Sequence, residues 1–425
     1  MNLIEQDKKV NWHPFTQMQT APDPIPMVRG DKEFLFDEQG NRWIDAISSW
    51  WVTVHGHAHP YMAQKIYEQA STLDHVIFAH FTHPKVVELS TRLLEKVQLN
   101  QVRCFYSDNG STSVEVGLKM AIQAHYNQGQ KRLHFFALEG AYHGDTFGAM
   151  AVGERSVFSA PFDDLLFDVT FLPVPTEENI GSIKQQIDEV CQTKDVAGFV
   201  YEPLVQGTAG MRMYSAELLQ EMMVMMKERN VLCIADEVFV GFGRTGKMFA
   251  SHYMDVHPDI MCFSKGLTGG IIALGITSCT QEVYDRFLSE DSMKTFFHGH
   301  SYTANPIACS AGCASLDLFE QEKTLERIAG IHNQHLAFID SVKDQNHISC
   351  RTMGSILAVE FKVENGGYFN DLAGKVHAFF KARYLLVRPL GNIIYLVPPA
   401  CISKNSLNEL YEAFRLFIEE VKDEI

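Results

Sequence analysis

Two residues near the middle of the chain have the types and the setting of a group-transfer site. Lys265 follows the apolar run 260–263 and is flanked by small residues, so we expect it to lose solvation. Desolvation lowers the pKa of a lysine amine and makes it a nucleophile that can form a Schiff base. Asp236 follows another apolar run, 231–235, and its buried carboxylate needs a cation such as a protonated ring nitrogen. A structural ion pair between the two residues is the alternative.

Two further segments carry residues suited to a phosphate and to a flat ring. Thr112 and Glu115 fit a capping box that opens a helix, which would put Gly110 and Ser111 at the helix N-terminus. Free amides and the helix dipole favour an anion there, although an ordinary capped helix has the same pattern. Tyr142 follows another apolar run and either stacks on a ring or covers the core.

An aromatic pair and an arginine could bind a substrate. Trp50 and Trp51 are two of the four tryptophans in the chain, and adjacent indoles favour one buried ring and one that faces a cleft. Arg388 lies in an apolar setting that suits a clamp for a carboxylate. Plain packing with an exposed charge is the alternative for all three.

Two other motifs carry less weight. The segment 241–247 has the spacing of a nucleotide-binding glycine loop, but Met248 stands where a serine or threonine should hold magnesium. His55, His57 and His59 resemble a metal motif without an acidic partner in sequence. We expect neither a nucleotide nor a metal.

The chemistry-bearing residues follow short apolar runs that alternate with segments of helical period. Such runs are typical of parallel strands buried on both faces, and ligands bind at the carboxyl ends of such strands. We therefore expect an α/β protein with a large, mostly parallel sheet flanked by helices over residues 56–320. Residues 1–55 and 321–425 are expected to form a smaller α+β domain. The runs are 102–106, 133–137, 169–172, 197–201, 231–235 and 260–263.

Composition narrows the class of protein. The net charge of -16 disfavours a polyanion such as DNA. No 18-residue apolar stretch and no signal-peptide core are present, and the nine cysteines include no CxxC pair. These features predict a cytoplasmic enzyme that binds neither nucleic acid nor membrane.

Together these segments resemble the class III aminotransferases of pyridoxal-phosphate fold type I. The resemblance runs through nearly the whole chain and is most specific over 234–246 and 264–270. Four other segments resemble the branch of that class that makes 7,8-diaminononanoate for biotin. They are 12–16, 48–51, 142–150 and 387–389.

The resemblance implies a role in holding pyridoxal 5'-phosphate for several residues. Lys265 would carry the cofactor and act as general base and acid, and Asp236 would pair with its ring nitrogen. Tyr142 would stack on the ring, and the start of the helix would hold the phosphate. A homodimer is implied, because the segment around Ser301 would reach the neighbouring subunit's cofactor. The implied cofactor-binding residues are Gly110, Ser111, Tyr142, Asp236, Lys265, His300 and Ser301.

The resemblance also implies the substrates. S-adenosylmethionine would give its amino group to 8-amino-7-oxononanoate in a ping-pong reaction, with Arg388 on the acceptor's carboxylate and Asp145 either orienting Arg388 or balancing its charge. Phe15 stands where a tyrosine is common, which leaves lysine open as the donor. Another class III transaminase, acting on an ω-amino acid or ornithine, is the remaining alternative. The implied substrate-binding residues are Phe15, Trp50, Trp51, Tyr142, Lys265, Gly299 and Arg388.

Overall fold

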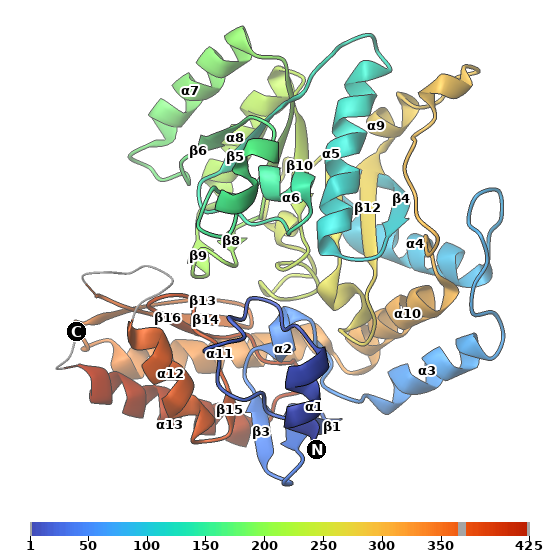
Figure 1. Ribbon diagram of the computed structural model, residues 1–425. Helices are drawn as coiled ribbons and strands as arrows, with labels where there is room; N and C mark the ends of the chain where they lie inside the picture. The colour runs from blue at the N-terminus through green and yellow to red at the C-terminus, as the bar shows by residue number, and fades with distance from the viewer. Residues whose placement is uncertain (1, 364–370, 423–425) are drawn as a thin grey trace.

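A seven-stranded sheet forms the centre of the larger part of the protein (Figure 1). The computed structural model describes residues 2–363 and 371–422 of the chain. The strand order is β4-β12-β11-β10-β7-β5-β6, and only β12 runs antiparallel to its neighbours. This confirms the expected α/β class with a mostly parallel sheet. The strands are β4 (Gln101–Ser107), β5 (His134–Leu138), β6 (Val169–Leu172), β7 (Val196–Tyr201), β10 (Leu232–Asp236), β11 (Ile260–Phe263) and β12 (Gly275–Thr280).

Six of these strands coincide with the apolar runs of the sequence, and β12 was not anticipated. Its sequence, GITSCT, has no apolar run, yet the strand is buried. Thr277 donates to the carbonyl oxygen of Ser113 at 2.7 Å, and Ser278 donates to the side chain of Gln101 at 2.6 Å. These hydrogen bonds satisfy hydroxyl groups that would otherwise be costly to bury.

Helices cover both faces of the sheet. Since successive strand residues point to opposite sides, neighbours in a strand pack against different helices. Ile234 packs in the cluster that includes α5, whereas its neighbour Ala235 packs in the cluster that includes Met222 of α8. The helices are α1 (Leu3–Val10), α2 (Ser48–Trp51), α3 (Pro60–Ala70), α4 (Pro84–Val97), α5 (Gly110–Tyr126), α6 (Phe147–Ala151), α7 (Ile180–Thr193), α8 (Ala216–Glu228), α9 (Gln281–Asp285), α10 (Pro306–Gln321), α11 (Thr324–Val342), α12 (Asp371–Lys381) and α13 (Lys404–Val421).

The two ends of the chain meet in the smaller sheets at the bottom of Figure 1. Strand β15, from the C-terminal part, pairs in parallel with β3 from the N-terminal part. The two segments therefore share one four-stranded sheet, in the order β1-β2-β3-β15. The smaller strands are β1 (Met27–Asp31), β2 (Phe34–Asp37), β3 (Arg42–Asp45), β8 (Val205–Gln206), β9 (Arg212–Met213), β13 (Ile348–Met353), β14 (Ile356–Phe361), β15 (Leu385–Leu386) and β16 (Ile393–Leu396).

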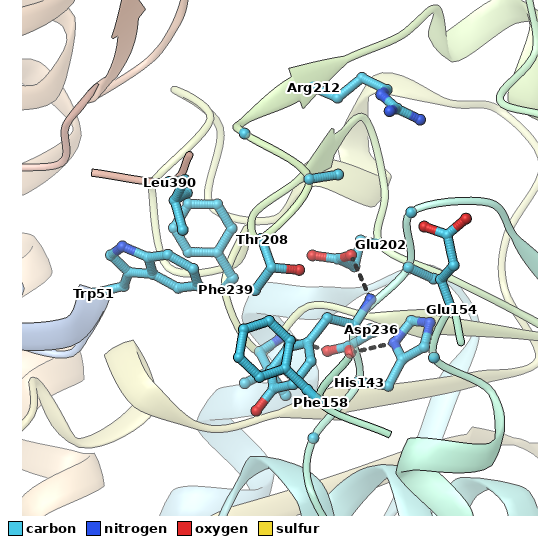
Figure 2. A pocket seen from close by; sticks show the side chains of 18 of the residues that line it. Trp51, His143, Glu154, Phe158, Glu202, Thr208, Arg212, Asp236, Phe239 and Leu390 are labelled. Carbon is cyan, nitrogen blue, oxygen red and sulfur yellow. Dashed lines mark hydrogen bonds and ion pairs between the residues drawn. The ribbon is translucent and has the colours of Figure 1, made fainter. Parts of the chain in front are cut away.

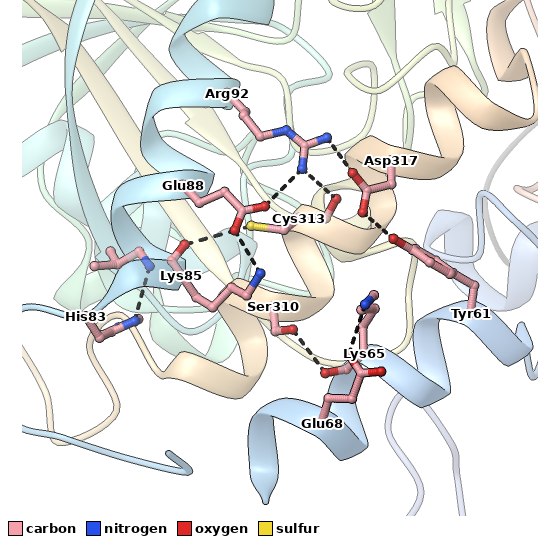
Figure 3. Close-up of polar contacts among 11 residues, drawn as sticks. Tyr61, Lys65, Glu68, His83, Lys85, Glu88, Arg92, Ser310, Cys313 and Asp317 are labelled. Atoms are coloured by element: carbon pink, nitrogen blue, oxygen red, sulfur yellow. Dashed lines mark hydrogen bonds and ion pairs between the residues drawn. The ribbon is translucent and has the colours of Figure 1, made fainter. Parts of the chain in front are cut away.

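A polar network fixes α3 and α4 against α10 (Figure 3). The Arg92 guanidinium lies 2.8 Å from Asp317 and also donates to the carbonyl oxygen of Cys313 at 3.3 Å. Tyr61 donates to the other oxygen of Asp317 at 2.7 Å. One carboxylate on α10 thus holds both α3 and α4.

Among the described helices, none has both the length and the apolar character required to cross a membrane. All nine cysteines are free thiols.

Candidate active site

One cavity of about 1100 Å³ brings together most of the residues singled out in the sequence. It lies where the carboxyl ends of the parallel strands face the smaller sheets, and Figure 2 shows Trp51 and Leu390 on one side of it and Asp236 and His143 on another. The predicted site residues in its wall are Phe15, Trp50, Trp51, Gly110, Ser111, Tyr142, Asp236, Lys265 and Arg388.

Lys265 begins the short helical turn that follows β11, with a φ of 46°. Its Nζ atom lies 4.7 Å from the centre of the Trp51 ring and 5.6 Å from that of Phe239. Burial lowers the pKa of this amine from 10.5 to about 8, although Asp236 and Glu202 act in the opposite direction. The amine forms no ion pair in the described part of the chain, so the alternative of a structural Asp236–Lys265 pair is wrong.

Asp236 ends β10 and is 4% exposed. One carboxylate oxygen lies 2.7 Å from Nδ1 of His143, and the other accepts from the amide of Val238 at 3.0 Å. His143 is also buried, and its Nε2 atom has no hydrogen-bond partner among the described residues. Sequence reasoning gave His143 no role, although its place after β5, at the same edge of the sheet, was a usable signal.

Glu202 is a second buried carboxyl group in the cavity wall that was missed, although it directly follows the apolar run 197–201. Burial raises its pKa from 4.5 to about 7. It accepts from the backbone amide of Gly207 at 2.9 Å. It therefore adds negative charge near the Lys265 amine only when it is ionised.

The helix α5 starts at Gly110, as its candidate role requires, but the predicted cap was wrong. Asn109 is the N-cap, since its side chain accepts from the amide of Thr112 at 3.0 Å and Thr112 accepts in return from the amide of Asn109. Glu115 does not join the cap, because its carboxylate accepts instead from the amide of Gly148 at 2.6 Å. The first amides of a helix have no acceptor within it, so Gly110 offers a donor toward the cavity.

Two glycines keep the backbone open at this helix start. A Cβ atom on Gly144 would lie 2.0 Å from the Ser111 hydroxyl oxygen, and Gly144 also has a φ of +127°. A Cβ atom on Gly110 would lie 2.7 Å from a methyl group of Val238. A side chain at either position would therefore collide with its neighbours at the helix start.

Tyr142 presents its ring to the cavity and is 37% exposed. The pKa of its hydroxyl is raised, chiefly by burial and then by Asp145, which also bonds to it through its side chain. Asp145 bonds to Tyr142 and forms no ion pair with Arg388 among the described residues, so it does not orient Arg388 by direct contact, and its balancing of the Arg388 charge stays a prediction.

Arg388 and the tryptophan pair form the other end of the cavity. The guanidinium carbon of Arg388 lies 4.6 Å from the centre of the Trp50 ring. Trp50 is 39% exposed and Trp51 only 3%, which confirms the prediction of one ring in a cleft and one in the core. Phe15 meets Trp50 edge-on at 5.7 Å between ring centres. The Arg388 guanidinium, which no described carboxylate neutralises, therefore lies against the aromatic wall that Trp50 and Phe15 form.

Gly299, His300 and Ser301 do not line this cavity. They lie before α10, where Gly299 and Ser301 are exposed. Nε2 of His300 is buried without a partner in the described part of the chain.

The two minor motifs have structural roles. In the glycine-rich segment, Arg244 is fully buried and donates to the carbonyl oxygens of Trp51 and Pro398. The histidine cluster is dispersed, since the Nε2 atoms of His55, His57 and His59 contact three different partners, and no group of metal-binding residues occurs among the residues described.

Comparisons with known proteins agree on one family. A profile described as aminotransferase class-III matches residues 16–418. The chain is 43% identical to an adenosylmethionine-8-amino-7-oxononanoate aminotransferase of Synechococcus elongatus over 96% of this chain and 98% of the relative. It is also similar to the crystal structure of the enzyme of that name from Methanocaldococcus jannaschii, with a TM-score of 0.93, 32% identity and 98% coverage of both chains. An amine transaminase from an uncultivated Pseudomonas species, solved in a PLP-bound form, has a TM-score of 0.89 at 28% identity and covers 97% of this chain and 98% of its own.

Proposed function

Because this chain belongs to the class III aminotransferases, we propose that it transfers an amino group from S-adenosylmethionine to 8-amino-7-oxononanoate, giving 7,8-diaminononanoate for biotin synthesis. The single observation that carries the assignment beyond the family is the position of Arg388 against Trp50, in the cavity that also contains the Lys265 amine. An acceptor with a reactive ketone, an apolar chain and a distant carboxylate matches this arrangement of amine, aromatic wall and cation.

The enzyme is a pyridoxal-phosphate-dependent aminotransferase, and its cavity fits that cofactor. A buried carboxylate at Asp236, an amine of lowered pKa at Lys265 and a helix start at Gly110 occur in one wall. Ser111 lines the same wall, and the absence of a side chain at Gly144 leaves room for its hydroxyl. When bound, pyridoxal phosphate supplies an aldehyde that captures the amine and a ring that accepts electrons from the reacting carbon.

Each group of the chain has a distinct task in this proposal. Lys265 Nζ would remove the proton from the reacting carbon of the donor and deliver it to the cofactor, and in the second half-reaction it would move a proton from the cofactor to the acceptor carbon that gains the amino group. A pKa of about 8 places the amine near its working range. The Asp236 carboxylate accepts hydrogen bonds from His143 and Val238, which hold it in place. Its charge would hold a proton on the cofactor's ring nitrogen. Tyr142 supplies a ring that stacks beside it.

The acceptor is held by the aromatic end of the cavity. Arg388 binds its carboxylate, while Trp50, Trp51 and Phe15 enclose its apolar chain and exclude water. Phe15 offers no hydroxyl to either substrate, which is the reason that lysine stays an alternative donor.

We also propose that two copies of the chain form a homodimer that completes each site. The support is that Ser301 is exposed and outside the cavity of its own chain, with Gly299 and His300 beside it. In the dimer, this segment would bind the cofactor phosphate and substrate of the other subunit. The net charge of -16 and the nine free thiols support a cytoplasmic location.

A single-turnover titration of the holoenzyme tests the assignment. Addition of S-adenosylmethionine should bleach the yellow absorbance of the bound cofactor, and 8-amino-7-oxononanoate should then restore it. Bleaching by lysine alone would reassign the donor. Turnover of ornithine or 4-aminobutyrate with no response to 8-amino-7-oxononanoate would overturn the proposal in favour of another class III transaminase.

A further inference from the structure

The turn that carries Trp50 and Trp51 is held in a strained conformation. Ser48, Ser49 and Trp51 all have a positive φ, of 50°, 60° and 68°. Residues with side chains rarely adopt such angles, and a run of them persists only where surrounding contacts over-determine the backbone. The turn therefore depends on whatever fixes it.

Asp45 accepts four of the hydrogen bonds that fix this turn. Its side chain is fully buried, and its two oxygens accept from the amide of Ser49 at 2.9 and 2.7 Å. The same carboxylate accepts from the amide of Ile47 at 3.2 Å and from the Ser49 hydroxyl at 3.2 Å. Four hydrogen bonds from two residues thus end on one carboxylate directly before the tryptophans.

His57 completes the arrangement from the opposite side. Its Nε2 atom lies 2.8 Å from Asp45, and its side chain is 13% exposed. The histidine backbone is itself fixed, because it exchanges two hydrogen bonds with Lys32 at 2.7 and 3.1 Å. The Asp45 carboxylate is therefore held between a rigid imidazole and the strained turn.

The consequence reaches the cavity through the two indoles. Trp50 lies beneath Arg388, and Trp51 lies beside the Lys265 amine and donates to the Tyr395 hydroxyl at 3.1 Å. Asp45 itself does not line the cavity. A small rotation of the turn would move the aromatic wall and leave Asp236 and Lys265 in place.

We propose that the buried Asp45–His57 pair is a positioning device that sets the pose of Trp50 and Trp51, and through them the affinity for the chain of the acceptor. The inference rests on the proposed function for the identity of that acceptor. Asp45 and His57 are positioning residues, since neither touches the cavity.

The chain offers a matched control in Asp37. This carboxylate is 4% exposed and accepts from the amides of Gln39 and Asn41 and from the indole nitrogen of Trp43. It fixes a turn and a tryptophan in the same small sheet, yet neither Asp37 nor Trp43 lines the cavity. A loss of general stability should affect both sites alike.

Steady-state kinetics of the Asp45→Asn holoenzyme test the proposal. The amide keeps the shape of the carboxylate but turns one acceptor into a donor facing the Ser49 groups. We expect the KM for 8-amino-7-oxononanoate to rise about tenfold, with kcat and the donor's single-turnover rate within about twofold of wild type. Asp37→Asn should leave all three within about twofold. Equal loss in both half-reactions, or an unchanged acceptor KM, would overturn the proposal.

Two further measurements keep the test decisive. If Asp45→Asn does not fold, His57→Gln should raise the acceptor KM in the same direction, and an unchanged KM there would count against the pair. The second measurement is acrylamide quenching of tryptophan fluorescence in a Trp12→Phe background, which removes the most exposed indole. The fluorescence of Asp45→Asn should be quenched more strongly than that of Asp37→Asn. The quenching measurement needs no substrate, so equal quenching of the two variants refutes the positioning role. A wild-type enzyme that does not turn over 8-amino-7-oxononanoate refutes only the proposed function.

Discussion

Nδ1 of His143 lies 2.7 Å from Oδ2 of Asp236, and both side chains are almost fully buried. Since a carboxylate only accepts hydrogen bonds, the imidazole donates and fixes the orientation of Asp236. Asp236→Asn should therefore lower kcat by about 10²- to 10³-fold with an unchanged fold. Stopped-flow kinetics and circular dichroism would measure the two effects. A kcat within tenfold of wild type would contradict the role of the carboxylate.

Lys265→Ala should abolish turnover, because it removes the only amine in the described wall of the cavity. We expect a loss of more than about 10⁴-fold, at the upper end of what proton transfer contributes. Lys247→Ala is the control, since that amine donates to the carbonyl oxygen of His252 outside the cavity. Rates near wild type for Lys265→Ala would disprove its assignment as the base.

The rate at which cofactor-free protein takes up pyridoxal phosphate should depend on the Lys265 amine. Burial lowers its pKa from 10.5 to about 8, so the neutral, nucleophilic form dominates above that pH. Uptake should increase with pH and level off just above pH 8. Stopped-flow absorbance over a pH series measures this profile. A rate that keeps increasing toward pH 10.5, the value for an unperturbed lysine, would show that the amine is solvated.

Arg388→Ala should raise the KM for 8-amino-7-oxononanoate by about 10- to 100-fold, the equivalent of one charge-assisted hydrogen-bonded pair. The donor half-reaction should change much less. Arg388→Lys keeps the charge but loses the planar group above Trp50, so it should recover only part of the affinity. Equal damage to both half-reactions would mark Arg388 as structural.

Gly144→Ala should weaken retention of the cofactor about tenfold or more, because the new methyl group would collide with Ser111 at a backbone φ of +127°. Retention can be followed by absorbance after gel filtration. Gly181→Ala is the control, since a Cβ atom there meets nothing within 4 Å and lies in helix α7. Equal retention in the two variants would exclude a role for this close approach.

The sheet and much of the cavity could be predicted from the sequence because their signals are local. Strands buried on both faces appear as apolar runs, and a residue that follows such a run is placed at the ligand-binding edge. Lys265 and Asp236 were found in this way. The antiparallel strand β12 was missed, since its buried hydroxyls are satisfied by Ser113 and Gln101, which are distant in sequence.

The parts that could not be predicted depend on pairings between distant segments. Asp236 meets His143 across 93 positions, which no local pattern reveals. Glu202, by contrast, directly follows β7 and could have been identified by the same rule as Asp236. Glu115 was misassigned because its partner, the amide of Gly148, comes from another element. Capping patterns record what a residue can do locally, whereas tertiary contacts decide which option is used.

The hydroxyl of Ser48 donates to the carbonyl oxygen of Val397, 349 positions further along the chain. Strands β3 and β15 also pair, so they join the two segments that form the acceptor end of the cavity. Trp50 comes from one of these segments and Arg388 from the other. During synthesis on the ribosome, every strand of the large sheet emerges before Arg388 does. The cofactor-binding part of the cavity can therefore fold while the two segments that form the acceptor end are still unpaired. A protein truncated before β15 would thus retain the pieces of a coenzyme site but have lost its means of choosing an acceptor.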